Sequence, residues 1–410
     1  MAPSSFGPAL WKPLLGTALL AFALGACARQ TTSALDSAQA QQPGFGEVAA
    51  SGPAAAGPAT AASVQSAPIR NAGDLQRLST TFADIARKVT PCVVNIQSQS
   101  VVAGRVLRDP FGDFFNGDNG GMMREPDQKR QSLGSGVIME PSGLIVTNNH
   151  VIKGATSIRV TLSDKRRFVA RLVGTDPDTD VAVLKINGSN LPALKWRDTS
   201  SLQVGEIVLA IGSPFNLAST VTQGILSAKG RRDLGISAYE DFLQTDAAIN
   251  PGNSGGALVD VDGNLIGINT AILSESGGNQ GIGLAIPANL ARKIAAELTR
   301  SGQVTRGWLG MVVEPITEDV AEQLQLADSR GVLVTGIYSN SPVATLPWAQ
   351  NGTAIVLSFN GTPIDSPGQL RILAGDVAPG APVKLRVWQD GAARDFTVNA
   401  GRRSPRVQGV

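Results

Sequence analysis

The sequence is poor in the residues that bind metals and form disulfides. It has one histidine and two cysteines among 410 residues. The cysteines, Cys27 and Cys92, are too few for a disulfide framework and form no pair of CxxC units. A zinc site needs several such ligands, and His150 is the one histidine, so we expect no metal and no cofactor. Cys92 lies among β-forming residues, and we expect it to be a small buried apolar side chain in a strand.

Charged residues are also scarce, at 17% of the chain, and the formal net charge is +2. No basic run with interleaved aromatic residues occurs, so the sequence does not predict nucleic-acid binding. The conspicuous basic cluster at 165–167 is expected at the solvated tip of a β-hairpin. With 42% hydrophobic residues, the chain is long and apolar enough for two folded domains with extensions.

The N-terminal residues 1–28 have the layout of an export signal. Lys12 precedes the apolar run LLGTALLAFALGA, which is too short to span a membrane. The sequence Leu24-Gly25-Ala26-Cys27 resembles the lipobox of bacterial lipoproteins, which predicts acylation of Cys27; the alternative is cleavage after Ala28, which leaves a free protein. We therefore expect the periplasm or cell envelope as the location, with Cys27 as a membrane tether.

Residues 29–74 are mostly small or polar and include almost no large apolar side chains that could form a core, so we predict a flexible tether with a reach of about 35 to 40 Å. A short amphipathic helix should follow, because Phe82, Ile85, Ala86 and Val89 recur at helical spacing before Pro91. From VVNIQSQSVV onward the chain changes to short β-branched runs separated by Gly, Asn, Asp and Pro. This pattern is typical of antiparallel barrels and not of a βαβ sheet.

Three further segments divide the chain. Residues 103–132 form a long glycine-rich and charged interruption that contains Phe111, Phe114 and Phe115, and we expect a functional or disordered loop there. The run ANLARKIAAELTRSG predicts a helix that ends at Gly302 and marks a domain boundary. Residues 305–400 then form a second, mixed α/β unit, and 401–410 are expected to be a loose tail.

A glycine-flanked serine, Ser254, lies in the segment NPGNSGGAL and satisfies G-x-S-x-G. No histidine follows it, which excludes the triad order of an α/β-hydrolase. The chain instead offers His150, Asp180 and Ser254 in the order used by chymotrypsin-like double β-barrels. A subtilisin-like order would need Asp113 or Asp118 in a parallel sheet, and the strand pattern disfavours it.

Three motifs, TNNHV, DPDTDVAVLKI and QTDAAINPGNSGGALVDVDGNLIGINT, resemble the HtrA (Deg) family of serine proteases over residues 80 to 300. The resemblance implies a chymotrypsin-like double β-barrel protease domain at 75–302. It also implies that His150 is the general base, Asp180 its orienting carboxylate and Ser254 the nucleophile. The glycines around Ser254 would let the backbone N–H groups of Gly252 and Ser254 converge in an oxyanion hole.

The specificity pocket should be apolar, because Ala248 lies six residues before Ser254, where trypsin-like enzymes have an aspartate, and Ile249 follows it. The resemblance implies cleavage of unfolded proteins after small aliphatic residues. It also gives a regulatory role to Arg231 in the loop RRDLGISAYED, although Arg232 is adjacent.

The C-terminal motifs RGWLGM, GVLVTGI and VLSFNGTPIDSPGQLRILAG resemble a PDZ domain, which binds C-terminal peptides by strand addition. The peptide carboxylate would lie at the backbone amides of Trp308, Leu309 and Gly310. The segment from Thr353 to Val356 departs from the family pattern, which puts the local turn and the peptide preference in question. The resemblance further implies homotrimers or multiples of trimers, with the 103–132 loop contributing between protomers.

These inferences predict an exported, ATP-independent endopeptidase that degrades misfolded envelope proteins. One alternative is a chaperone or binding protein for unfolded chains, with its catalytic residues held in an inactive arrangement. Another is a narrow regulatory protease that senses one ligand through its PDZ domain.

Overall fold

The computed structural model describes residues 71–102, 106–108, 122–124, 128–214, 219–272, 280–326, 329–350 and 353–403. The predicted export signal, the lipobox with Cys27, nearly all of the predicted tether and the three phenylalanines of the 103–132 segment lie outside these ranges. No helix in the described ranges is long and apolar enough to cross a membrane.

The first helix, α1 (Ala72–Val89), is longer than the sequence predicts and begins inside the segment assigned to the tether. The Asn71 side chain caps it by accepting a hydrogen bond from the N–H of Asp74 at 3.1 Å. Its C-terminal end is fixed by the burial of Ile85 and Val89. A short 3₁₀ turn, η1 (Thr90–Cys92), then leads into the first strand, so Cys92 is buried as predicted but precedes the strand.

The first sheet has seven antiparallel strands in the order β7-β6-β1-β4-β5-β9-β8. They are β1 (Val93–Val102), β4 (Gln128–Glu140), β5 (Leu144–Asn148), β6 (Ala155–Thr161), β7 (Arg167–Val169), β8 (Arg171–Asp176) and β9 (Val181–Lys185). The predicted 103–132 loop is shorter in the structure, because β4 begins at Gln128 and a small pair forms between β2 (Val106–Arg108) and β3 (Met122–Arg124).

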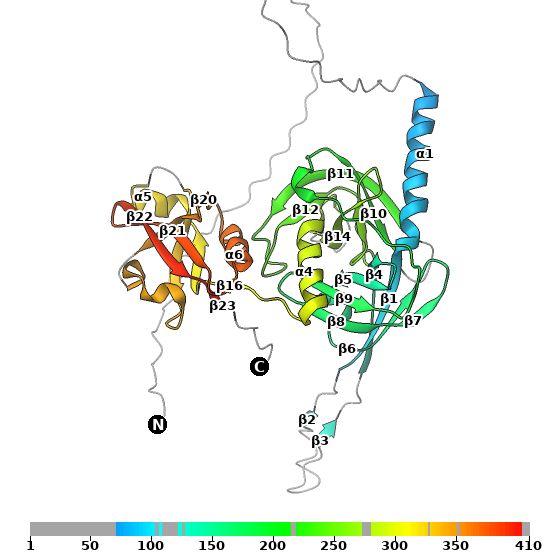
Figure 1. Cartoon of the computed structure of the whole chain (residues 1–410), viewed down its shortest axis with the longest axis horizontal. Helices are drawn as coiled ribbons and strands as arrows, with labels where there is room; N and C mark the ends of the chain where they lie inside the picture. The colour runs from blue at the N-terminus through cyan, green and yellow to red at the C-terminus, as the bar shows by residue number, and fades with distance from the viewer. Residues whose placement is uncertain are drawn as a thin grey trace, which may run out of the picture. The chain divides into compact units, whose positions relative to one another are not determined.

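The second sheet closes into a barrel in the order β10-β11-β12-β15-β14-β13 (Figure 1). Its strands are β10 (Ile207–Gly212), β11 (Thr220–Arg231), β12 (Phe242–Thr245), β13 (Ala257–Val259), β14 (Leu265–Ile272) and β15 (Gly283–Pro287). The short η2 (Thr199–Ser201) precedes the barrel. The predicted mainly antiparallel β architecture is therefore confirmed.

The two sheets share one of the hydrophobic cores. One buried cluster contains Val137 and Val146 of the first sheet together with Phe242 of the barrel. The helix α4 (Ala288–Ser301) adds further buried residues, Ile294 and Leu298 among them, and lies beside β8 and β9 (Figure 1). The helix ends at Gly302 in the left-handed conformation, with φ of 73°, as the sequence predicts.

The C-terminal part contains a second sheet system with its own core. A sheet runs in the order β17-β18-β19-β21-β22, with β20 beside β19, and a separate pair joins β16 to β23. The strands are β16 (Gly307–Trp308), β17 (Met311–Pro315), β18 (Val332–Ile337), β19 (Ala354–Phe359), β20 (Thr362–Pro363), β21 (Pro382–Gln389), β22 (Ala392–Asn399) and β23 (Gly401–Arg402).

Short helices connect these strands: α5 (Glu318–Gln323), η4 (Pro342–Thr345), η5 (Pro347–Gln350) and α6 (Pro367–Asp376). Trp348 and Phe359 are buried in this core. The unusual segment 353–356 enters β19, where Ala354, Ile355 and Val356 are buried. Because β23 pairs with β16, the predicted loose tail begins with a strand.

Candidate active site

His150 and Asp180 come together at the ends of neighbouring strands of the first sheet. β5 ends at Asn148 and leads into the single turn α3 (Asn149–Ile152), which carries His150, and Asp180 directly precedes β9. The Nδ1 of His150 lies 2.6 Å from Asp180 Oδ2, and the backbone N–H of His150 donates to Oδ1 at 2.9 Å. Two contacts between the same residues fix the orientation of the imidazole ring.

The backbone at Asp180 adopts the left-handed conformation, with φ of 60°. Aspartate is among the residues that tolerate this region, yet the conformation is costly, and such strain concentrates at functional sites. The carbonyl of Asp180 accepts hydrogen bonds from the N–H of Asn149 at 3.0 Å and from Asn148 Nδ2 at 3.1 Å. The two asparagines of the TNNHV motif therefore fix the turn that carries the carboxylate.

Thr270 is a site residue that the sequence does not predict. Its hydroxyl donates to Asp180 Oδ2 at 2.9 Å, and its carbonyl accepts a hydrogen bond from Ser254 Oγ at 3.2 Å. Within the described ranges, Ser254 makes no hydrogen bond to His150. Thr270 ends the quoted motif DGNLIGINT, so its position was visible, but its contacts depend on how β14 packs against the first sheet.

The loop around Ser254 is held by glycines where a side chain would not fit. Gly252 has φ of 98°, and a Cβ there would lie 2.6 Å from Pro214 Cβ. Gly255 has φ of 82°, and a Cβ there would collide with the carbonyl oxygen of Ser135. Among the described residues, the N–H groups of Gly252 and Ser254 have no hydrogen-bond partner. Both therefore remain able to bind an oxygen atom of a ligand.

Ser135 is a second residue that the sequence does not predict, and it ties the Ser254 loop to the first sheet. Its hydroxyl donates to the carbonyl of Gly252 at 2.6 Å and accepts from the N–H of Ser213 at 2.8 Å. Its N–H donates to the carbonyl of Ser254 at 2.8 Å. A serine in the middle of β4 carries no distinctive sequence signal.

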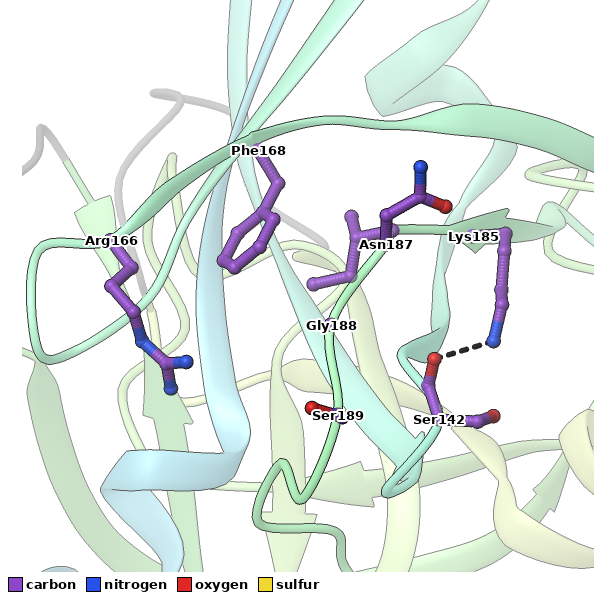
Figure 2. Close-up of a pocket in the computed structure, with 8 residues that line it drawn as sticks. Ser142, Arg166, Phe168, Lys185, Asn187, Gly188 and Ser189 are labelled. Carbon is purple, nitrogen blue, oxygen red and sulfur yellow. Dashed lines mark hydrogen bonds between the residues drawn. The ribbon is translucent and has the colours of Figure 1, made fainter.

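A cavity of about 350 Å³ opens beside His150, which is 48% exposed at its side chain. It is lined by Asn149, His150, Lys153, Pro177, Asp180, Ile236 and Thr270. A different cavity of about 480 Å³ lies in the first sheet beside Phe168 (Figure 2). Its two cations are already engaged: Lys185 Nζ donates to the carbonyl of Ser142 at 2.5 Å, and Arg166 pairs with Asp164 at 2.8 Å.

The strand before Asp180 is anchored by a buried ion pair. Arg306 is 8% exposed and contacts both carboxylate oxygens of Asp176, with 2.8 Å to Oδ1. Burial alone would lower the pKa of Arg306, but the bond to Asp176 outweighs it, so the pKa is raised and the guanidinium stays charged. The guanidinium also lies over the Tyr239 ring, 4.4 Å from its centroid.

The other predicted site residues lie as follows. Ala248 is half-buried, and Ile249 is buried in the core of the second barrel; neither lines the cavity beside His150. Arg231 ends β11 and donates to Gln244 Oε1 at 2.7 Å. Trp308 pairs with β23, Leu309 is buried, and Gly310 has φ of 78° with its carbonyl accepting from Tyr338.

Known proteins resemble this chain over most of its length. The trypsin-like peptidase domain family matches residues 134–268. A probable periplasmic serine endoprotease DegP-like protein of Chlamydia pneumoniae is 41% identical over 351 residues, which cover 82% of this chain and 71% of that protein. A relative with the same description from Pseudomonas putida strain W619 is 42% identical over 335 residues, covering 78% and 69%.

Solved structures give the same result. The HtrA-type protease AlgW with a bound decapeptide has a TM-score of 0.65 and 41% identity, covering 79% of this chain and 99% of that one. A serine endoprotease from Yersinia pestis has a TM-score of 0.55 and 35% identity, covering 79% and 98%. The fold and the site define a trypsin-like serine endopeptidase. Within that class, the chain belongs to the family of HtrA-type, DegP-like serine endoproteases.

Proposed function

We propose that Ser254 is the nucleophile of this endopeptidase, His150 its general base and Asp180 the carboxylate that orients the base. The observation that carries the proposal is the double contact between His150 and Asp180, at 2.6 and 2.9 Å. With Nδ1–H donated to Asp180, the other ring nitrogen, Nε2, has a free lone pair. That nitrogen takes the Ser254 proton during attack on the peptide carbonyl and returns it to the leaving amine.

The geometry also supports a resting state that must rearrange before attack. The Ser254 hydroxyl donates to the Thr270 carbonyl, so it has to rotate about its Cα–Cβ bond to donate to His150. The unpaired N–H groups of Gly252 and Ser254 would then stabilise the negative oxygen of the tetrahedral intermediate. Loss of one such donor typically costs about 2.7 to 4 kcal/mol of transition-state stabilisation.

The enzyme works outside the cytoplasm, in the periplasm or cell envelope, where its DegP-like relatives are named as residing. Its proposed substrates are misfolded or unfolded envelope proteins, degraded without ATP. Cleavage after small aliphatic residues is supported by Ala248, which is neutral and small where a basic specificity would need a carboxylate. The decapeptide bound to AlgW supports extended peptides as ligands.

The C-terminal unit is proposed to be a PDZ domain that binds peptide C-termini. The strand β17 is first in the order of its sheet, so one of its edges is unpaired among the described residues and could accept an added strand. The backbone of Trp308, Leu309 and Gly310 lies immediately before that strand. Trimer formation, lipid anchoring through Cys27 and regulation through Arg231 complete the proposal.

The decisive experiment incubates the full-length protein with reduced casein, beside Ser254→Ala and the matched variant Ser142→Ala. Ser142 is exposed and bonds to Glu140, away from the site. We expect fragments ending in Val, Ile or Ala from the wild type and from Ser142→Ala. A loss of about a thousandfold or more is expected in Ser254→Ala. Mass spectrometry identifies the cut sites, and undiminished cleavage by Ser254→Ala would sink the assignment.

A second candidate function, a binding protein for unfolded chains, is favoured by one observation: the Ser254 hydroxyl is engaged by Thr270 and not by His150. Under this alternative, wild type and Ser254→Ala would suppress aggregation of an unfolded client equally, and neither would cut it. The same incubation, followed by light scattering, separates the two functions.

A further inference from the structure

Lys153 lines the cavity beside His150, and the proposed chemistry gives it no role. It follows α3 directly, and Gly154, with φ of 68°, then turns the chain into β6. The turn is firmly held, because Val151 and Ile152 are buried and the Val151 carbonyl accepts from Ser98 Oγ at 2.7 Å. The backbone of Lys153 therefore keeps a fixed place relative to His150, while its side chain is exposed.

Among the described residues, no negative group around the cavity pairs with the positive charge of Lys153. The other titratable groups that line the cavity in the described ranges are His150 and Asp180. Both oxygens of Asp180 are already engaged, by the His150 ring and backbone and by the Thr270 hydroxyl. Across the part of the chain that the structure describes, the Lys153 ammonium has neither an ion pair nor a hydrogen bond. A positive charge thus stands at the cavity without a partner among the described residues.

Apolar residues, Pro177 and Ile236, also line the cavity. Ile236 is 38% exposed, but its backbone is fixed, since its N–H donates to Glu240 Oε1 at 2.5 Å. The buried carboxylate of Glu240 also accepts from the N–H groups of Leu234 at 2.5 Å and Ser237 at 2.8 Å. The carboxylate of Glu240 is therefore engaged by the backbone N–H groups of its own loop.

We propose that Lys153 is a specificity-determining residue that binds an acidic side chain of the substrate within two residues of the scissile bond. The inference rests on the proposed roles of His150 and Ser254, which place the scissile bond beside this cavity. A glutamate fits the lining best, because its methylene groups can lie against Pro177 and Ile236 while its carboxylate reaches the ammonium. An exposed charge pair of this kind changes affinity roughly twofold to fivefold.

The test uses the full-length protein and quenched fluorescent peptides that share a central valine. Cleavage is expected after the valine, so each peptide pair differs in one residue, glutamate or glutamine, either directly before the valine or at one of the two positions after the cut. The value of kcat/KM is measured for wild type, Lys153→Glu, Ser254→Ala and Lys165→Glu. Lys165 lies in the 162–166 turn and does not line the cavity, so its variant makes the same charge change elsewhere.

We expect the wild type to prefer the glutamate peptide about twofold to fivefold in kcat/KM at one position, mainly through a lower KM. This preference should disappear in 1 M salt, where charges are screened within about 3 Å. Lys153→Glu should reverse the preference, and Lys165→Glu should retain it. If Lys153→Glu has a lower melting temperature than the wild type, Lys153→Gln replaces it in the test. This variant should abolish the preference for glutamate without reversing it.

Equal cleavage of glutamate and glutamine peptides by the wild type would overturn the role of Lys153. So would an equal loss of preference in Lys165→Glu, because the cause would then be the overall field of the molecule. If Ser254→Ala cuts these peptides, or if the wild type cuts none of them, the proposed function itself fails. A wild type that cuts the peptides without preference leaves the proposed function intact.

Discussion

At the scale of single residues, the hydrogen bond from the Thr270 hydroxyl to Asp180 should have a measurable effect on catalysis. It donates one of the hydrogen bonds to the carboxylate of Asp180, which is only 14% exposed at its side chain. Thr270→Val preserves the shape and removes this bond. Because hydrogen bonds to charged groups contribute about 1.5 to 3 kcal/mol, we expect kcat/KM to fall about 10- to 150-fold.

The matched control for this prediction is Thr156→Val, whose hydroxyl donates to the carbonyl of Gln99 on an exposed strand. We expect kcat/KM of Thr156→Val on the quenched fluorescent peptides to equal that of the wild type, with Thr270→Val measured on the same peptides. Equal activity of Thr270→Val and the wild type would show that the carboxylate of Asp180 is oriented by His150 alone.

Cys92 gives a prediction about pH. Burial raises the pKa of its thiol from 9.0 to about 11, only partly offset by the nearby Lys88. The folded state therefore holds this proton more tightly than the unfolded state, and the associated stability is lost as the pH rises from about 9 to 11. Melting temperatures between pH 8 and 11 should fall more steeply for the wild type than for Cys92→Ala.

A labelling measurement checks the same residue. In a Cys27→Ala background, a maleimide reagent at pH 8 should leave the native protein unmodified and label it fully in urea, because Cys92 is 4% exposed and protonated. Rapid labelling of the native protein would contradict the burial of this thiol.

The residues of the candidate site were predictable to different degrees. His150, Asp180 and Ser254 followed from their order and from motifs that surround each of them, and the structure brings His150 and Asp180 within 2.6 Å. The roles of Thr270 and Ser135 were not predictable, because both act through contacts across strands far apart in the sequence. The sequence also could not tell that the Ser254 hydroxyl donates to Thr270.

At the scale of elements, the loop between β12 and β13 depends on backbone conformations that only glycine adopts without strain. Gly255 combines φ of 82° with a Cβ position occupied by Ser135 and Thr147. Gly205 has φ of 96° but open space around it. Alanine substitutions at these two glycines therefore separate the free-energy cost of the backbone conformation from that of the steric collision.

We expect Gly205→Ala to lower the free energy of unfolding by about 1 to 2 kcal/mol and to leave peptide cleavage unchanged. Gly255→Ala carries the same conformational cost and must also displace Ser135 from the loop, so activity should fall below detection. Urea unfolding and peptide hydrolysis on both variants measure the two effects. Equal residual activity in both variants would mean that the loop tolerates a shift of β4.

Elements were predictable where a local signal exists. The Gly302 end of α4 and the period of the apolar strands are such signals, and both are confirmed. The first ten residues of α1 carry a weaker signal, so the sequence predicts a later start than the observed Ala72. Strand β23 was missed because its two residues pair with β16, nearly a hundred residues earlier.

At the scale of the whole molecule, the segment that matches the trypsin-like peptidase domain family, 134–268, is smaller than the folded unit. It lacks β1, which lies between β4 and β6, and β15, which closes the second barrel between β12 and β14. We expect residues 134–268 alone to show no cooperative thermal transition, and residues 71–302 to melt cooperatively. Near-ultraviolet circular dichroism distinguishes them, and a cooperative transition in the shorter fragment would contradict the prediction.

The shared core between the two sheets also bears on how the protein matures. His150 follows β5 and Asp180 precedes β9 of the first sheet, whereas Ser254 lies between β12 and β13 of the barrel and is tied across by Ser135. Under the proposed roles of these three residues, neither half holds a working set of groups by itself. A newly exported chain that has folded only one half is therefore inert, and it cannot digest the unfolded proteins, its own copies included, that surround it while it matures.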